Sequence, residues 1–347
     1  MKGRLIALDH IAGREAAALM VNGRLEDLLV QGDGPRLGDI HRAIVDRPIK
    51  GQGGVIVRLA DGATGYLRRA RGLAPGQVID VMVSGYAEAE KAVPVTDRLL
   101  FKSRYAIVTP DAPGINVSRS IRDDDQRDTL LGLARAAFDG EMDARAGLIL
   151  RSASEGADID EIAEDIAAMV ALAQHVAQAP SDAPAKLAEG DGPHLTAWRE
   201  WCAPAQIERD AGCFEDLGVL EAIEALFEPY ESLGAGHMYV EPTRALVSVD
   251  VNTGRDTSPA AALKANMAAV RDIGRALTLR GLGGQVTMDL APMTKRDRKQ
   301  IETSLRAALR KGAVETEFVG WTPLGHVELK RKRERQPLSE VLAGVFS

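Results

Sequence analysis

The feature that most constrains the fold is an alternation of strand and helix patterns after residue 236. Short apolar runs typical of strands occur at 238–240, 245–251 and 286–290. The last two runs are separated by one helical pattern, and a second helical pattern covers 296–311. Alternation of this kind predicts a layered α/β region, whose functional side chains lie at the carboxyl ends of the strands.

The first of these helices has residues that favour its two ends. Ser258 suits the N-cap, Pro259 suits the first helical position, and Gly281 suits the end of the helix. Apolar residues between them recur at helical spacing and predict the buried face, namely Leu263, Met267, Val270, Ile273 and Leu277.

Three polar residues mark the ends of two predicted strands. Asp250 and Asn252 are two positions apart, so a strand would point both side chains to the same face. Asp289 ends the next apolar run, and a right-handed crossover would make the two strands neighbours. Two carboxylates brought together repel each other unless a hard cation lies between them. This spacing predicts a metal site. The alternative is that Asp250 and Asp289 each cap the loop that begins there, which would give the same pattern.

The segments before this region read as small β structures. The first 36 residues contain apolar runs around an Asn22-Gly23 hairpin turn and predict a β-meander. Five short strands then follow, and this number and spacing favour a small RNA-binding barrel of the OB type. The predicted barrel strands are 38–45, 54–59, 64–67, 78–84 and 92–97.

The middle of the chain is mixed. Strands are predicted at 105–109 and 147–151, with a turn at 110–114 and a helix at 124–137 between them. A second helix follows Asp158, a typical N-cap, and carries an acidic outer face. The prolines and glycines of 179–194 indicate a linker.

Composition narrows the class of protein. The chain has 347 residues, of which 45% are apolar, which is enough for about two globular domains. No apolar run reaches the ~20 residues of a membrane helix, and the first residues do not resemble a signal peptide, so the cytoplasm is the expected location. The cysteines, Cys202 and Cys213, lack the CxxC spacing of a zinc site. Although the net charge is −7, the basic segment at 330–335 could still bind RNA.

One stretch resembles a known family. The sequence 245–254, Asn266, 279–284, Asp289 and Met293-Thr294 together resemble the catalytic core of the ribonuclease E/G family. The resemblance implies a Mg²⁺-dependent endoribonuclease that cleaves single-stranded RNA, with Mn²⁺ as a substitute metal. In that family two aspartates hold the ion and an asparagine orients the water or the aspartate, roles that fall on Asp250, Asp289 and Asn252. Pro292 stands where the family often has another acidic residue.

The resemblance also assigns residues that would bind RNA. Tyr66 and Lys91 match RNA-contacting positions of the family's barrel, while Ile56 replaces a second aromatic residue. The segment 147–153 is similar to the one in which an arginine and a neighbouring threonine of the family bind the 5′-phosphate of RNA. Arg151 matches the arginine, and Ser152 keeps the hydroxyl that the threonine would provide. An ordinary half-buried tyrosine and a solvated arginine are the alternatives for Tyr66 and Arg151.

Near the end of the chain, 325–333 resembles the last part of the family's catalytic subdomain. Arg331 and Arg333 are there the candidates for contacts with the RNA backbone. His326 stands where the family has an apolar residue, and we do not expect it to be a catalytic base.

The resemblance implies a mixed α+β and α/β architecture of several subdomains. The expected subdomains are an N-terminal meander at 1–36, an OB-type barrel at 37–100, a 5′-sensor-like subdomain at 101–185, a linker and reduced segment at 186–235, and a DNase I-like catalytic subdomain at 236–347. The meander and the reduced segment would form a shortened RNase H-like subdomain. We expect a short form without the zinc link and the small domain, so no zinc is expected and a homodimer would need another surface.

The expected function is cleavage of single-stranded RNA in RNA processing or decay, with a preference for 5′-monophosphorylated ends. One alternative is an RNA-binding regulator that keeps this fold with weak or absent catalysis. A nuclease of structured RNA or of DNA is another. Retention of Asp250, Asn252 and Asp289 favours the enzyme, since an inactive site has no need of clustered carboxylates.

Overall fold

The computed structural model describes residues 3–49, 51, 53–68, 70, 72–87, 91–138, 140, 142–180 and 183–346. The chain forms two compact units, one made of Met1–Gly32 with Ala205–Ser347 and the other of Asp33–Pro204. Each of the four buried apolar clusters lies within a single unit. Among the described residues, no helix is long and apolar enough to cross a membrane.

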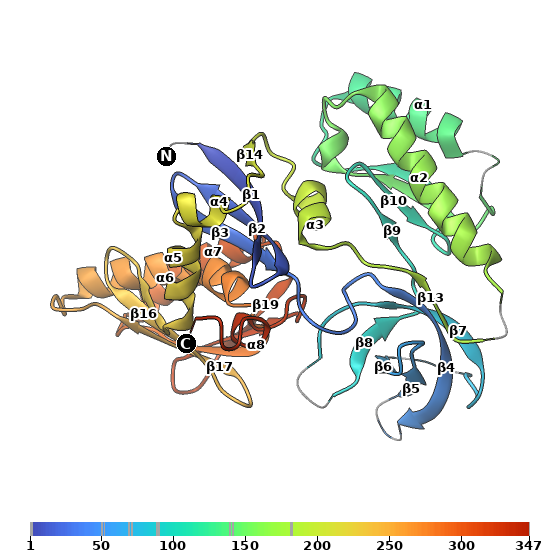
Figure 1. The fold of residues 1–347 in the computed structure, drawn as a ribbon. Coiled ribbons are helices and arrows are strands. Elements are labelled where there is room, and N and C mark those ends of the chain that lie inside the picture. Colours follow the sequence, from blue (N-terminus) through green and yellow to red (C-terminus); the bar gives the residue numbers. More distant parts are fainter. Residues whose placement is uncertain are drawn as a thin grey trace. The chain divides into compact units, whose positions relative to one another are not determined.

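The larger sheet of the first unit has six strands. Its strand order is β15 (Tyr230–Ser232), β16 (His237–Pro242), β17 (Val247–Asn252), β18 (Gly284–Asp289), β20 (Val327–Arg331) and β19 (Thr316–Trp321). Of these strands, β16, β17 and β19 are labelled in Figure 1. Strands β17 and β18 are parallel, as predicted from the helix between them, and the other pairs are antiparallel. The carboxyl ends of β17 and β18 therefore meet at one edge.

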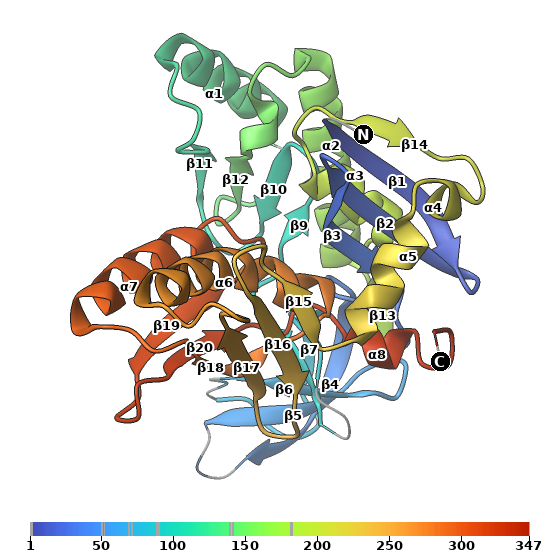
Figure 2. The ribbon, with the colours of Figure 1, turned by 90° about the vertical axis from the view of Figure 1, so that its left-hand side faces the viewer.

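Two helices, α6 (Pro259–Leu279) and α7 (Lys295–Leu309), pack side by side against this sheet (Figure 2). The predicted start of α6 is confirmed, because Ser258 Oγ accepts a hydrogen bond from the backbone N–H of Ala261 at 3.2 Å. The predicted buried face is partly wrong, because Leu263 and Met267 are only partly buried. Alanines make up much of the buried face, namely Ala262, Ala265, Ala269 and Ala276.

A second sheet of the first unit contains the predicted meander. Its strands are β1 (Arg4–Ile11), β2 (Arg14–Val21) and β3 (Arg24–Val30), with β14 (Gln206–Glu208) added parallel to β1. Asn22 and Gly23 both have positive φ, as a two-residue hairpin turn requires. Short helices pack on this sheet, namely α4 (Cys213–Asp216), α5 (Val219–Glu224), η2 (Ala225–Phe227) and α8 (Leu338–Val341).

The second unit begins with the predicted barrel. Its strands are β4 (Ile40–Ile49), β5 (Gly54–Arg58), β6 (Thr64–Leu67), β7 (Val78–Val83) and β8 (Val93–Thr96). Strand β4 pairs with both β5 and β7, and this second pairing closes the five strands into a barrel. The prediction of a linker at 179–194 is corrected by the structure, because β13 (Ala185–Ala188) lies in this range and pairs with β4. Helix α3 (Pro193–Glu200) follows it.

The rest of the second unit is a small sheet covered by two helices. Its strands are β9 (Phe101–Lys102), β10 (Ala106–Thr109), β11 (Gly114–Val117) and β12 (Gly147–Leu150), and its helices are α1 (Asp124–Phe138) and α2 (Ile159–Gln178). The predicted cap is confirmed, since Asp158 accepts hydrogen bonds from the first turn of α2. The boundary between the two units falls within 186–235, so this segment is divided between them.

Candidate active site

Asp250 lies near the carboxyl end of β17, and Asp289 is the last residue of β18. They are register partners in the β17–β18 pair, so the two residues lie directly opposite each other. Both are exposed at the edge where the strands end. The topology thus brings together two carboxylates that lie 39 positions apart in the sequence.

Asn252 lies beside this pair. Its Nδ2 atom donates a hydrogen bond to Oδ2 of Asp250 at 2.8 Å. The two residues share one face of β17 because strand side chains alternate. This bond restricts the rotation of the Asp250 carboxylate.

His326 also lies at this edge, although we did not expect it to take part. Its Nε2 atom is 3.7 Å from Oδ1 of Asp289. The histidine belongs to the turn between β19 and β20, and its neighbour Val327 is the register partner of Met288. The antiparallel β18–β20 pairing therefore places residue 326 next to residue 289, and only this long-range pairing reveals the contact.

The chain that follows Asp289 is held by Asn266 of α6. This side chain is fully buried. Its Nδ2 atom donates to the carbonyl of Ala291 at 2.8 Å, and its Oδ1 atom accepts from the N–H of Ala291 at 2.9 Å. The amide thus replaces a missing strand partner and fixes the segment that leaves the active-site edge.

The donor set at this edge fits a magnesium ion. Mg²⁺ prefers oxygen ligands and is commonly held by one or two carboxylates, with water and substrate phosphate completing the shell. Asp250 and Asp289 supply such carboxylates. Within the described ranges, there is no group of three or more His, Cys, Asp or Glu side chains that could hold a metal ion.

The barrel residues expected to contact RNA lie on or beside neighbouring strands. Tyr66 is on β6, and Lys91 is exposed just before β8, which pairs with β6. Tyr66 is half-buried, and its ring lies over the backbone of Gly54, where an added Cβ would be 2.5 Å from Cε2 of the ring. Ile56 is the register partner of Tyr66, so an aliphatic side chain stands opposite the tyrosine. RNA contacts of Tyr66 and Lys91 stay predictions.

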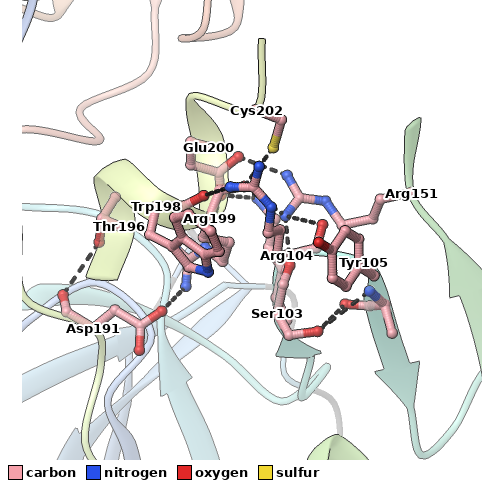
Figure 3. A network of polar contacts seen from close by, with 12 residues as sticks. Ser103, Arg104, Tyr105, Arg151, Asp191, Thr196, Trp198, Arg199, Glu200 and Cys202 are labelled. Atoms are coloured by element: carbon pink, nitrogen blue, oxygen red, sulfur yellow. Dashed lines mark hydrogen bonds and ion pairs between the residues drawn. The ribbon is translucent and has the colours of Figure 1, made fainter. Parts of the chain in front are cut away.

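Arg151 is engaged by the protein itself (Figure 3). Its Nη1 atom donates to the backbone carbonyls of Ser103, Arg104 and Arg199. Its Nη2 atom donates to Oε2 of Glu200 at 2.7 Å. Ser152, the other expected phosphate ligand, is exposed beside it.

Glu200 lies at the end of α3 in a cluster of cations. Besides Arg151, it binds Nζ of Lys102 at 2.7 Å and Nε of Arg199 at 2.8 Å. Burial by itself would raise the pKa of Glu200, but the hydrogen bond and charge of Lys102 and the charge of Arg151 outweigh it and lower the pKa to about 2. The carboxylate is therefore charged at neutral pH and occupies Nη2 of Arg151.

The expected contact of Arg331 with the RNA backbone needs correction. Its side chain is buried, and its guanidinium donates to the carbonyl of Leu282 and to the hydroxyls of Thr278 and Thr316. Burial lowers the pKa of Arg331 to about 10. Because these internal contacts occupy the guanidinium, Arg331 supports the sheet and does not face RNA. Arg333 is half-exposed, and its guanidinium lies over Gly284, where it leaves no room for a Cβ.

The comparisons with known proteins point to one family. The profile of the Ribonuclease E/G family matches residues 101–208 and 204–334. Ribonuclease E of Nostoc sp. is 26% identical over 97% of this chain and 56% of its own length. Ribonuclease G of Salmonella typhimurium is 29% identical over 77% of this chain and 62% of its own length. The chain thus spans less than two thirds of these relatives. Since the profile matches more than half of the chain, the chain belongs to the ribonuclease E/G family.

Proposed function

We propose that this protein is a Mg²⁺-dependent endoribonuclease that hydrolyses single-stranded RNA in cytoplasmic RNA processing or decay. The observation that carries the proposal is the pairing of Asp250 with Asp289 at the ends of two parallel strands. The names of the relatives, ribonuclease E and ribonuclease G, support the choice of substrate.

Asp250 and Asp289 would hold the ion against the scissile phosphate. A bound Mg²⁺ would offset the phosphate charge and make water more acidic. Asn252 keeps the Asp250 carboxylate in one orientation through their 2.8 Å hydrogen bond. Hydrolysis directed in this way leaves a 5′-phosphate and a 3′-hydroxyl on the products.

Single-stranded RNA is the proposed substrate because the barrel offers one aromatic ring beside a cation. A base can stack on Tyr66 only when it is not paired, and Lys91 can then bind the adjoining phosphate. Stacking contributes ~1–3 kcal/mol per base, so Ile56 in place of a second ring would weaken the grip of the barrel on RNA. Arg333 remains a candidate for a further phosphate contact.

The proposal includes a preference for RNA that carries a 5′-monophosphate. Arg151 and the exposed Ser152 would bind the terminal phosphate, which needs a planar guanidinium and a hydroxyl. Glu200 opposes this, because its carboxylate already accepts from Nη2 of Arg151. The preference therefore depends on how easily the phosphate replaces Glu200.

A substrate panel separates the proposal from its alternatives. The purified chain is incubated with single-stranded RNA, double-stranded RNA and single-stranded DNA, each with Mg²⁺, Mn²⁺ or EDTA. We expect cleavage of single-stranded RNA with Mg²⁺, retained activity with Mn²⁺ and none with EDTA. Binding without cleavage would identify an RNA-binding regulator, and preferred cleavage of duplex RNA or of DNA would identify a different nuclease.

A further inference from the structure

A groove runs between α6 and α7 on the first unit. Its volume is about 530 Å³, and it is lined by Met267 and Arg271 of α6 together with Arg296, Lys299, Gln300 and Ser304 of α7. Lys299, Gln300 and Ser304 follow Arg296 by three, four and eight positions, so the α7 residues share one face of the helix. Along α7 this face extends for roughly 16 Å from Arg296 to Ala307, at about 1.5 Å per residue.

The groove is positively charged. Arg271, Arg296 and Lys299 are exposed, and their side chains make no hydrogen bond or ion pair within the part of the chain that the structure describes. No carboxylate lines the groove. The hollow therefore concentrates positive charge on a protein whose net charge is −7.

The carboxylates of the same two helices are all engaged elsewhere. Asp272 binds Arg24 and Arg275, and Asp297 accepts from the N-cap residue Thr294. Glu302 accepts from Nε of Arg306 at 2.9 Å and from the indole N–H of Trp321. These are the only acidic residues of α6 and α7. An anion from outside the chain is therefore the natural counter-charge of the groove.

The groove starts at the edge that carries the aspartates. Helices α6 and α7 begin in the loops that follow β17 and β18, and these parallel strands end at one edge. Arg296 follows Asp289 by only seven positions in the sequence. A polyanion held between the aspartates can thus continue along the two helices without leaving the first unit.

We infer that the α6–α7 groove binds the sugar–phosphate backbone of RNA that flanks the cleavage site. Arg271, Arg296 and Lys299 would each contact a phosphate, and Gln300 and Ser304 offer neutral groups for ribose hydroxyls and phosphate oxygens. The extended row of cations suits a repeating polyanion better than a single ion. The choice of RNA as the ligand rests on the proposed function.

The test measures binding without cleavage. The triple variant Arg271→Gln, Arg296→Gln, Lys299→Gln is titrated with fluorescent single-stranded RNAs of about 4 and 16 nucleotides in EDTA at several salt concentrations. Each lost phosphate contact lowers the salt slope of log K by ~0.7, so we expect a decrease of about 2 and an affinity loss of about 10- to 100-fold for the longer RNA. The short RNA should lose less than about threefold, because its few phosphates cannot occupy the aspartate edge and the whole groove at the same time.

A matched control removes the same charge elsewhere. Arg244→Gln, Arg310→Gln and Lys311→Gln alter three exposed residues of the first unit, in the turn before β17 and after the end of α7. The inference is overturned if this control weakens RNA binding as much as the groove variant does, or if the groove variant keeps the wild-type salt slope. Poly-glutamate that displaces the long RNA as well as unlabelled RNA does would assign the groove to acidic peptides instead.

The outcome is separable from that of the proposed function. Wild-type protein that binds long RNA through the groove but never cleaves it would refute the nuclease proposal and leave the groove inference standing. Wild-type protein that cleaves RNA while the groove variant binds it normally would refute the groove inference alone.

Discussion

At the residue scale, we expect Glu200 to control which ligands Arg151 can bind. Replacement of Glu200 by glutamine removes the charge bound to Nη2 of Arg151, which in the proposed function would compete there with a 5′-phosphate. We expect the KM for 5′-monophosphorylated RNA to fall about three- to tenfold, with 5′-hydroxylated RNA unchanged, since a charge-assisted bond contributes ~1.5–3 kcal/mol. Steady-state cleavage of the two RNAs measures this.

Two further variants help to interpret the result for Glu200→Gln. Arg151→Ala should raise the KM for monophosphorylated RNA about 10- to 100-fold and abolish the preference. Glu164→Gln, a charge change at an exposed position of α2, should alter neither KM. Equal slowing of both RNAs by Arg151→Ala would show that Arg151 only holds the local structure.

The depressed pKa of Glu200 also predicts how stability depends on pH. A carboxyl group whose pKa is lower in the folded protein stabilises the fold above its unfolded pKa and loses this effect as the pH falls. With a pKa of about 2 in the fold against an ordinary 4.5, the window is pH 4.5 to 2. Urea unfolding of wild type and Glu200→Gln should differ by a constant free energy above that window and converge within it. A difference that persists at pH 2 would contradict the assignment.

Asn266 links α6 to the segment that follows β18, so its replacement should destabilise both. Asn266→Leu keeps the volume but leaves both backbone groups of Ala291 without their partners. Buried polar groups left unpaired cost ~1–3 kcal/mol each, so the loss of two partners should lower the free energy of unfolding by about 2–6 kcal/mol. Urea unfolding measures the loss, with Asn116→Leu at an exposed strand position as the control. A loss below about 0.5 kcal/mol would show that the two bonds contribute little.

Elements with strong periodicity could be predicted from the sequence, and short ones could not. The barrel strands and α6 follow from alternation and capping residues, and the convergence of Asp250 and Asp289 follows from the crossover between parallel strands. Strand β13 was missed because its partner, β4, lies more than 130 residues earlier. Strand β20 did contain a signal for Arg331, because Val327, Leu329 and Arg331 alternate and all three are buried. The basic composition of that segment concealed this alternation.

The whole molecule should be divisible at the boundary between its units. Residues 33–204 contain two complete apolar clusters, so this fragment should fold alone and unfold cooperatively. Residues 205–347 should not fold alone, because one of their clusters also takes Leu5, Ala18 and Leu28 from the N-terminal sheet. Circular dichroism during thermal unfolding checks both fragments. A cooperative transition of 205–347 without the first 32 residues would contradict this division.

The central claim is that Asp250 and Asp289 act together on a metal and the scissile phosphate. The most direct measurement is the rate of single-stranded RNA cleavage, as a function of Mg²⁺ concentration, by wild type, Asp250→Asn and Asp289→Asn. Each substitution keeps the volume and removes one charged oxygen ligand, so both rates should fall at least about a thousandfold, which corresponds to ~4 kcal/mol of transition-state stabilisation. Circular dichroism should show both variants folded. Cleavage by both variants within tenfold of wild type at every Mg²⁺ concentration would contradict the account.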